Sequence, residues 1–143
     1  MTGFLGSFLH QLDEKGRLAL PVSFRRSAED DGFVLTAAGE PALFLYPARA
    51  WAGVEERLIE LQRRQPGARS SVLRVTANAV EAVPDKQGRI LIPERLQRAA
   101  ELDGEALIIG ALDKIEIWNP ERFETTTREA ESDFDRFVKQ ILV

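Results

Sequence analysis

Two short strings of the sequence place an acid, a glycine and an arginine at the same spacing. Asp13-Glu-Lys-Gly-Arg recurs as Asp85-Lys-Gln-Gly-Arg, 72 residues further along the chain. The guanidinium of arginine is planar and permanently charged, so it can pair bidentately with a guanine edge or with phosphate. Arg17 and Arg89 therefore predict binding to DNA or RNA, with surface ion pairs as the alternative use of these side chains.

The other residues of each string suit a tight turn that holds the arginine. An aspartate at the head of a turn can bond its own backbone further along, and the glycine supplies the positive φ of a type I turn with a bulge. Lys15 and Lys86 lie at the tips of the turns and are the expected phosphate contacts. Four residues are expected to support the turns: Asp13, Gly16, Asp85 and Gly88.

Basic residues also occupy the short helices predicted after the turns. Pro21 and Pro93 end the strands that carry the arginines and suit the first turn of a helix. We therefore expect helices near residues 22–29 and 94–101. Four basic side chains on them could extend the same surface: Arg25, Arg26, Arg95 and Arg98.

Both strings belong to a tandem repeat. A shift of 72 residues without a gap gives ten identities between residues 13–46 and the later copy, among them Leu35 over Leu107. Ordinary composition would give about two. Apolar character matches at further positions, namely Leu43/Ile115, Leu45/Ile117 and Tyr46/Trp118. The pattern indicates a duplicated module.

Each copy predicts the same order of elements. Apolar residues on both sides of the turn indicate two short strands joined by it, and the short helix follows. Two more strands close each copy, at 33–36 and 43–46 and again at 106–109 and 115–118. The expected fold class is α+β, with two tandem β-α-β-β modules.

The domain organisation follows from these elements. The modules are expected at residues 5–47 and 77–120, and each precedes a longer helix, at 48–65 and 121–141. Residues 66–71, Pro-Gly-Ala-Arg-Ser-Ser, have the composition of a linker.

Composition favours a soluble, globular, non-enzymatic protein. Of the 143 residues, 44% are hydrophobic and 29% are charged, and no apolar run approaches the roughly 20 residues that span a bilayer. No cysteine is present, and His10, the single histidine, is expected to be structural. Nucleophile and metal constellations are therefore missing, so we expect no enzyme, no metal and no cofactor. The start of the chain lacks the features of a signal peptide, and a cytoplasmic location is expected.

The net charge of −4 argues mildly against a nucleic-acid partner. Charge acts over only about 10 Å at ordinary salt, however, so its local distribution matters more. Residues 10–26 and residues 85–98 each carry +2, whereas residues 121–143 carry −2. The excess negative charge thus lies partly outside the repeated segments.

The motifs resemble a known family. Asp13–Pro21, followed by Phe24-Arg-Arg, resembles the DNA-binding module of the AbrB/SpoVT family. Two such modules in tandem within this length resemble the MraZ family of bacterial regulators, as do Leu43–Pro47 with Trp51, and Lys114–Trp118. The resemblance covers nearly the whole chain.

This resemblance implies a fold, an assembly and a partner. The strand–turn–strand pieces of the two halves would interlock as swapped hairpins related by a pseudo-two-fold axis. The chains would form homo-oligomeric rings that bind short double-stranded DNA repeats upstream of division and cell-wall genes, at the nucleoid. Arg17 and Arg89 would be the readers, supported by Asp13 and Asp85. The match extends the DNA-binding set to Arg25, Arg26 and Arg98, with Gln97 replacing the equivalent of Arg25.

A protein-interaction module, such as an antitoxin of AbrB-like fold, is the alternative function. That role would require an extra segment that grips a toxin. Residues 121–143 instead carry an apolar stripe and predict a packed helix, which favours the regulator.

Overall fold

The computed structural model describes residues 3–28, 31–128 and 133–142. The first half forms β1 (Ser7–Gln11), β2 (Arg17–Ala19), α1 (Val22–Ala28), β3 (Phe33–Ala37) and β4 (Ala42–Pro47). The second half repeats this order as β5 (Val80–Ala82), β6 (Arg89–Leu91), α4 (Glu94–Ala99), β7 (Glu105–Gly110) and β8 (Ile115–Trp118). The α+β class is as predicted. The last two strands of each half, β3 and β4 and then β7 and β8, lie within a residue or two of their predicted bounds.

Both halves contribute strands to one antiparallel sheet. Its order is β1-β7-β8-β4-β3-β5, while β2 and β6 form a separate two-stranded ribbon. Each half therefore places its first strand on the edge of the other half's hairpin. A two-stranded hairpin alone is marginally stable, and the exchange joins the hairpins of both halves, with β1 and β5 at the edges, in one six-stranded sheet.

The two strands joined by the first turn pair mainly with strands of the other half. β1 pairs with β7 and β2 pairs with β6, so both partners come from the other half. Local pairing around the first turn includes the Leu12–Leu18 bridge and a hydrogen bond from the Asp13 backbone N–H to the Arg17 carbonyl. Alternating apolar residues predict a strand, but they carry no information about which strand lies beside it.

The strand registers obey an internal two-fold relation. Leu18 faces Ile90 in the ribbon, and Phe44 faces Glu116 in the sheet. Each of these residues faces the residue 72 positions later, its own equivalent in the repeat. A pseudo-two-fold axis therefore passes between both pairs and relates the two halves as it would relate the subunits of a symmetric dimer.

One strand departs from the ungapped repeat. Phe8 lies opposite Ile108, whereas the equivalent pair on the other side of the sheet is Val80 opposite Leu35. In the structure Leu35 is therefore equivalent to Ile108, 73 positions later. The ungapped alignment of the two copies instead pairs Leu35 with the identical Leu107. One extra residue at the start of β7 causes the shift, which buries Ile108 and leaves Leu107 half-buried.

A single hydrophobic core joins the two halves. The ribbon contributes Leu18 and Ile90, both completely buried, and the short helices contribute Phe24 and Leu96. A module of about 50 residues buries too little apolar surface to be stable by itself, and the shared core removes that limit. The sheet contributes Phe33, Leu35, Leu43, Leu45, Ala82, Ala106, Ile108, Ile115 and Ile117, and the cluster also includes Phe4, Leu20, Ile92 and Ala100.

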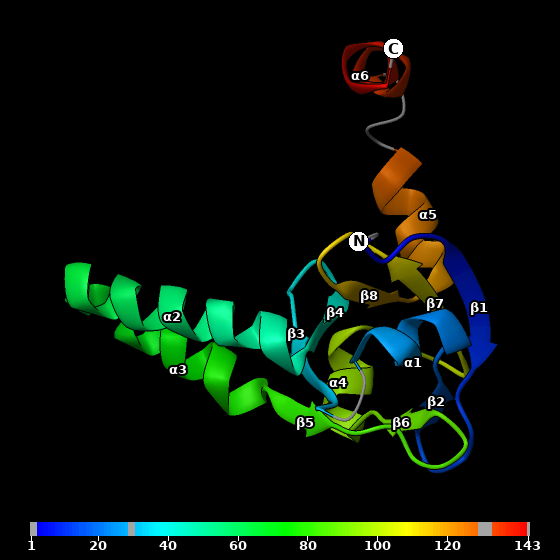
Figure 1. Ribbon diagram of the computed structural model, residues 1–143, viewed down its shortest axis with the longest axis horizontal. Coiled ribbons are helices and arrows are strands. Elements are labelled where there is room, and N and C mark those ends of the chain that lie inside the picture. Colours follow the sequence, from blue (N-terminus) through cyan, green and yellow to red (C-terminus); the bar gives the residue numbers. More distant parts are fainter. Residues whose placement is uncertain (1–2, 29–30, 129–132, 143) are drawn as a thin grey trace.

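Two helices between the halves form a hairpin that projects from the β-rich body (Figure 1). α2 (Ala48–Arg64) matches the predicted helix, and a 3-10 turn at Pro66–Ala68 leads into α3 (Arg69–Asn78). The linker predicted at 66–71 is therefore wrong, because residues 69–71 begin a helix. The sequence of α3 has few regularly spaced apolar residues, and Val72 is its one buried side chain, so its helical periodicity is weak.

The C-terminal segment forms α5 (Pro120–Arg128) and α6 (Phe134–Ile141). Four residues of the predicted 121–141 helix, 129–132, lie outside the described residues. Neither α5 nor α6 contains a buried residue, and α6 lies away from the β-rich body (Figure 1). The expected packing is confirmed for Phe123 of α5, whose ring lies 5.5 Å from that of Trp118, but not for α6. Phe134, Phe137 and Ile141, the α6 members of the apolar stripe that gave this expectation, are exposed.

Within the described residues, none of the helices combines the length and the apolar character that crossing a bilayer requires.

Candidate nucleic-acid interface

The first Asp-x-x-Gly-Arg turn is built around the carboxylate of Asp13. Its Oδ1 accepts hydrogen bonds from the backbone N–H groups of Lys15 and Arg17, both at 2.9 Å. Its Oδ2 accepts a hydrogen bond from Nε of Arg17 at 2.7 Å. The aspartate thus fixes both the backbone of the turn and the base of the guanidinium.

The second turn repeats this geometry. Asp85 Oδ1 accepts from the backbone N–H groups of Gln87 and Arg89 at 2.9 and 3.0 Å, and its Oδ2 accepts from Arg89 Nε at 3.0 Å. In both turns the backbone N–H of the arginine is the main cause that lowers the pKa of the aspartate, against a smaller effect of burial. The glycines have φ angles of +83° at Gly16 and +80° at Gly88, so both adopt the left-handed region that was predicted.

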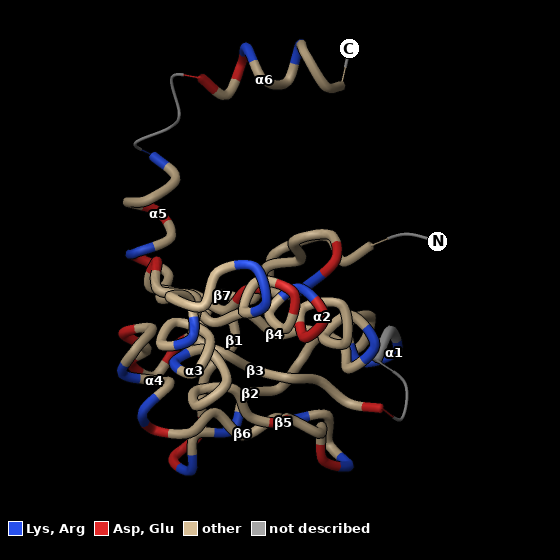
Figure 2. Tube along the Cα trace, turned by 90° about the vertical axis from the view of Figure 1, so that its left-hand side faces the viewer, with Lys and Arg blue, Asp and Glu red and all other residues tan. Residues whose placement is uncertain are grey.

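The two turns lie at the same edge of the molecule, one at each end of the antiparallel β2–β6 ribbon (Figures 1 and 2). Ile92 donates its backbone N–H to the Gly16 carbonyl, and Leu20 donates to the Gly88 carbonyl, both at 2.9 Å. Arg89 also approaches the other turn, with Nη1 3.8 Å from Asp13 Oδ2. Both arginines therefore stand on one ribbon, with their side chains about one-third exposed.

Each turn packs against the short helix of the opposite half. Gly16 lies against the Gln97 side chain of α4, and Gly88 lies against the Arg25 side chain of α1. We call residues 13–17 together with α4 the first head, and residues 85–89 together with α1 the second head. Side chains at Gly16 or Gly88 would overlap these neighbours, so the glycines serve the contact between halves as well as the turn.

The pairing of each turn with the helix of the opposite half gives the two heads unequal net charges. The first head holds four basic residues and three acidic ones, for a net charge of +1. The second head also holds four basic residues but only Asp85 as an acid, for a net charge of +3. Counting along the sequence gives +2 for each copy, because it assigns each helix to the turn that precedes it.

The remaining residues of the predicted site occupy different environments. Lys15 and Lys86 are exposed at the turn tips, and Arg26 is exposed on α1. Arg98 is exposed on α4 and forms an ion pair with Glu94 at 3.2 Å. Arg25 is half-buried, and its Nε is buried without a hydrogen-bond partner.

Gln97 is the residue whose place the sequence did not indicate. Its Nε2 donates to the Ile92 carbonyl at 2.8 Å, and it lines a recess between the first turn and the start of α4. In the sequence it is merely the residue equivalent to Arg25. Only the packing of α4 against the opposite turn shows that Gln97 and Arg25 perform the same structural task.

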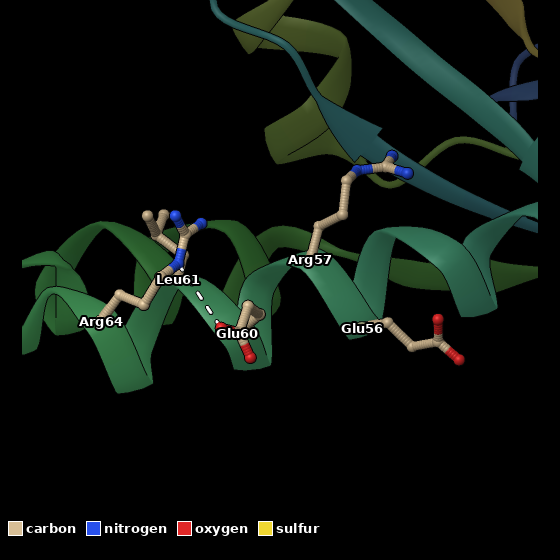
Figure 3. A pocket seen from close by; sticks show the side chains of 5 residues that line it. All are labelled: Glu56, Arg57, Glu60, Leu61 and Arg64. Atoms are coloured by element: carbon tan, nitrogen blue, oxygen red, sulfur yellow. Dashed lines mark ion pairs between the residues drawn. The ribbon is translucent and has the colours of Figure 1, made fainter.

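A second depression lies along α2 and is lined by that helix alone (Figure 3). Two acids and two arginines balance one another there, and Glu60 pairs with Arg64 at 3.5 Å. This surface therefore offers no excess of positive charge to phosphate. Among the described residues, no group of three or more His, Cys, Asp or Glu side chains is arranged to hold a metal ion.

Known proteins resemble this chain over almost its whole length. A family model described as "MraZ protein, putative antitoxin-like" matches residues 4–74 and again residues 75–141. A protein of Pediococcus pentosaceus named transcriptional regulator MraZ is 41% identical over 139 residues, which cover 97% of this chain and 96% of that protein. Proteins with the same name from Desulforamulus reducens and Lactiplantibacillus plantarum are 37% and 36% identical, over 97% of this chain in both cases.

Proposed function

Because this chain belongs to the MraZ family, we propose that it is a transcriptional regulator that binds double-stranded DNA through its two heads. One observation carries the proposal: two arginines, each anchored by the aspartate of its own turn, occupy diagonal positions on the same face of one ribbon. An arginine held at Nε loses little rotational freedom on binding and keeps its terminal N–H donors for guanine or phosphate.

The interlocked strands support the same proposal. We interpret residues 5–47 and 77–120 as two AbrB/SpoVT-like modules in a swapped-hairpin arrangement, since each half completes the other's sheet. The arrangement places both turns on one edge. A two-stranded ribbon also fits the major groove of B-form DNA, which is about 12 Å wide.

Basic residues around the ribbon would bind phosphate. Lys15, Lys86, Arg26 and Arg98 are exposed on the two heads. Arg25 has a second role, since its side chain packs against Gly88 and supports the turn that holds Arg89. The proposal includes no catalytic step and no cofactor, and it places the chain with the chromosome in the cytoplasm.

Assembly would strengthen the modest affinity that one acidic chain can provide. We propose a homo-oligomeric ring in which successive chains bind short DNA repeats upstream of division and cell-wall genes. Linked weak contacts can raise overall affinity by about 10²–10⁴ without any new contact.

A double substitution tests whether Arg17 and Arg89 bind DNA. Arg17→Ala/Arg89→Ala should lower affinity for the DNA upstream of the chain's own gene by at least about tenfold in fluorescence anisotropy, because each lost guanidinium contact costs about 1–3 kcal/mol. Arg63→Ala/Arg74→Ala on the projecting hairpin is the matched control, since it removes the same charge far from the ribbon. Unchanged affinity in a folded Arg17/Arg89 variant, verified by circular dichroism, would remove both arginines from the interface.

A role in protein interaction is the second candidate, and α6 supports it. Phe134, Phe137, Ile141 and Leu142 are all more than half exposed. We propose that this face packs against another copy of the chain. Phe134→Ser/Phe137→Ser should then reduce the mass measured by light scattering. A wild-type chain that is already a stable monomer would contradict the ring and favour a different protein as the partner of α6.

A further inference from the structure

The outer face of the β2–β6 ribbon carries four side chains. Leu18 and Ile90 form the central pair of the ribbon and point into the core, with no exposed surface. Side chains alternate along a strand, so the flanking residues point to the other face. These are Arg17 opposite Leu91, and Ala19 opposite Arg89. The arginines therefore occupy one diagonal of a rectangle, and Ala19 and Leu91 occupy the other.

Leu91 is an exposed aliphatic residue on this charged surface. Its exposed fraction is 56%, and it lines the recess beside the first turn together with Asp13, Lys15 and Gln97. It is not part of the hydrophobic core. The pseudo-two-fold relation provides an internal comparison, because Ala19 fills the equivalent place and the ribbon forms there equally well. The fold therefore does not require a leucine at position 91.

Resting on the proposed DNA-binding function, we infer that Leu91 is a base-reading residue that contacts the C5-methyl group of a thymine. In the major groove that methyl is the apolar feature of a base edge, and proteins recognise it through apolar side chains. Leu91 lies opposite Arg17 and two residues beyond Arg89 on β6, so its target lies beside the base or phosphate that the arginines bind. Ala19 has three fewer side-chain carbons and extends less far towards the symmetry-related base, so its apolar contact there should be smaller.

The asymmetry has a consequence for the DNA element. A ribbon with identical outer residues would read the same base on both sides of its pseudo-two-fold axis, and a palindrome would satisfy it. With leucine on one side and alanine on the other, the chain should prefer an element that has thymine on one side only.

The test begins with duplexes selected by the wild-type chain from a randomised pool. In the selected duplex each thymine is replaced singly by uracil, which lacks the methyl group. We expect one replacement to weaken wild-type binding by about fourfold, the value of one buried methyl group. Leu91→Ala should bind the thymine and uracil duplexes equally. Insensitivity of the wild type to every replacement, or full sensitivity in Leu91→Ala, would overturn the inference.

An exchange of the two residues provides an independent test. Ala19→Leu/Leu91→Ala should select an element in which the thymine preference moves to the symmetry-related position. Ile59→Ala is the control, because Ile59 is similarly exposed at 49% but lies on the projecting hairpin. A selected element identical in wild type and exchange variant would overturn the role of Leu91 alone. Failure of the wild type to enrich any sequence would overturn the proposed function as well.

Discussion

The two heads share one backbone design and differ in the charge around it. In both, an aspartate accepts two backbone N–H groups and an arginine Nε, and a glycine in the left-handed region closes the turn. The surroundings differ. Gln97 packs on the first turn and Arg25 packs on the second, and the net charges are +1 and +3.

This difference shows which residues of the duplicated module are constrained by folding. The residues that build the turn and hold the arginine occur in both copies. Residues on the outer surface, such as Glu14 and Lys86 at equivalent turn positions, have diverged. If both heads bind DNA, the second should supply more of the phosphate contacts, and the first should be closer to neutral and rely more on base contacts.

Replacement of the two turn glycines should have the largest effect, and its effect on DNA binding should differ between the heads. Gly16→Ala and Gly88→Ala should each lower the free energy of unfolding by about 1–2 kcal/mol, because alanine is strained at positive φ. Urea denaturation measures this loss. In addition, Gly88→Ala pushes the guanidinium of Arg25 away from the second head and should weaken DNA binding more than Gly16→Ala. Equal loss of affinity in the two variants would contradict a role for Arg25 in the second head.

Two double substitutions that each remove two positive charges measure how much each head contributes to the salt dependence of DNA binding. Their effect should be intermediate in size. Arg26→Ala/Lys86→Ala removes two positive charges from the second head, and Lys15→Ala/Arg98→Ala removes two from the first. Each phosphate contact contributes about 0.9 to the dependence of log affinity on log salt, so the second-head pair should lower that slope by about 2. The first-head pair should lower it by about 1, since Glu94 already engages Arg98. Equal slopes in salt titrations would show that the heads contribute equally.

The acid dependence of stability should give the smallest effect. Both aspartates have a pKa below their ordinary value in the folded chain, so the unfolded chain binds more protons as the pH falls. Their stabilising contribution is complete above the unfolded value of about 3.9 and is lost as the pH falls through the folded values. Asp13→Asn and Asp85→Asn should each flatten the fall in stability between about pH 5 and pH 2. Asp13→Asn should flatten this fall in stability more than Asp85→Asn, because Arg89 also approaches Asp13. Identical pH profiles of stability would show that the Arg89–Asp13 contact does not contribute to stability.

Local chemistry explains why much of the fold was predictable. Gly16 and Gly88 predicted positive φ, Pro21 and Pro93 predicted the starts of α1 and α4, and short apolar segments predicted β3, β4, β7 and β8. These features depend on residues within a few positions of one another. The helix α3 was missed because nearby residues give it only a weak apolar pattern. Packing defines its one buried residue.

The sequence by itself determined that a module is duplicated and that each copy presents an arginine at a tight turn. Tertiary structure decided which helix accompanies which turn, and so converted equal charges along the chain into unequal heads. It also decided that Leu35 matches Ile108 and that Leu91 faces outward beside the arginines. The physical reason is that strand pairing and core packing join residues far apart in the chain, and no local pattern of residue types specifies which distant partner each surface finds.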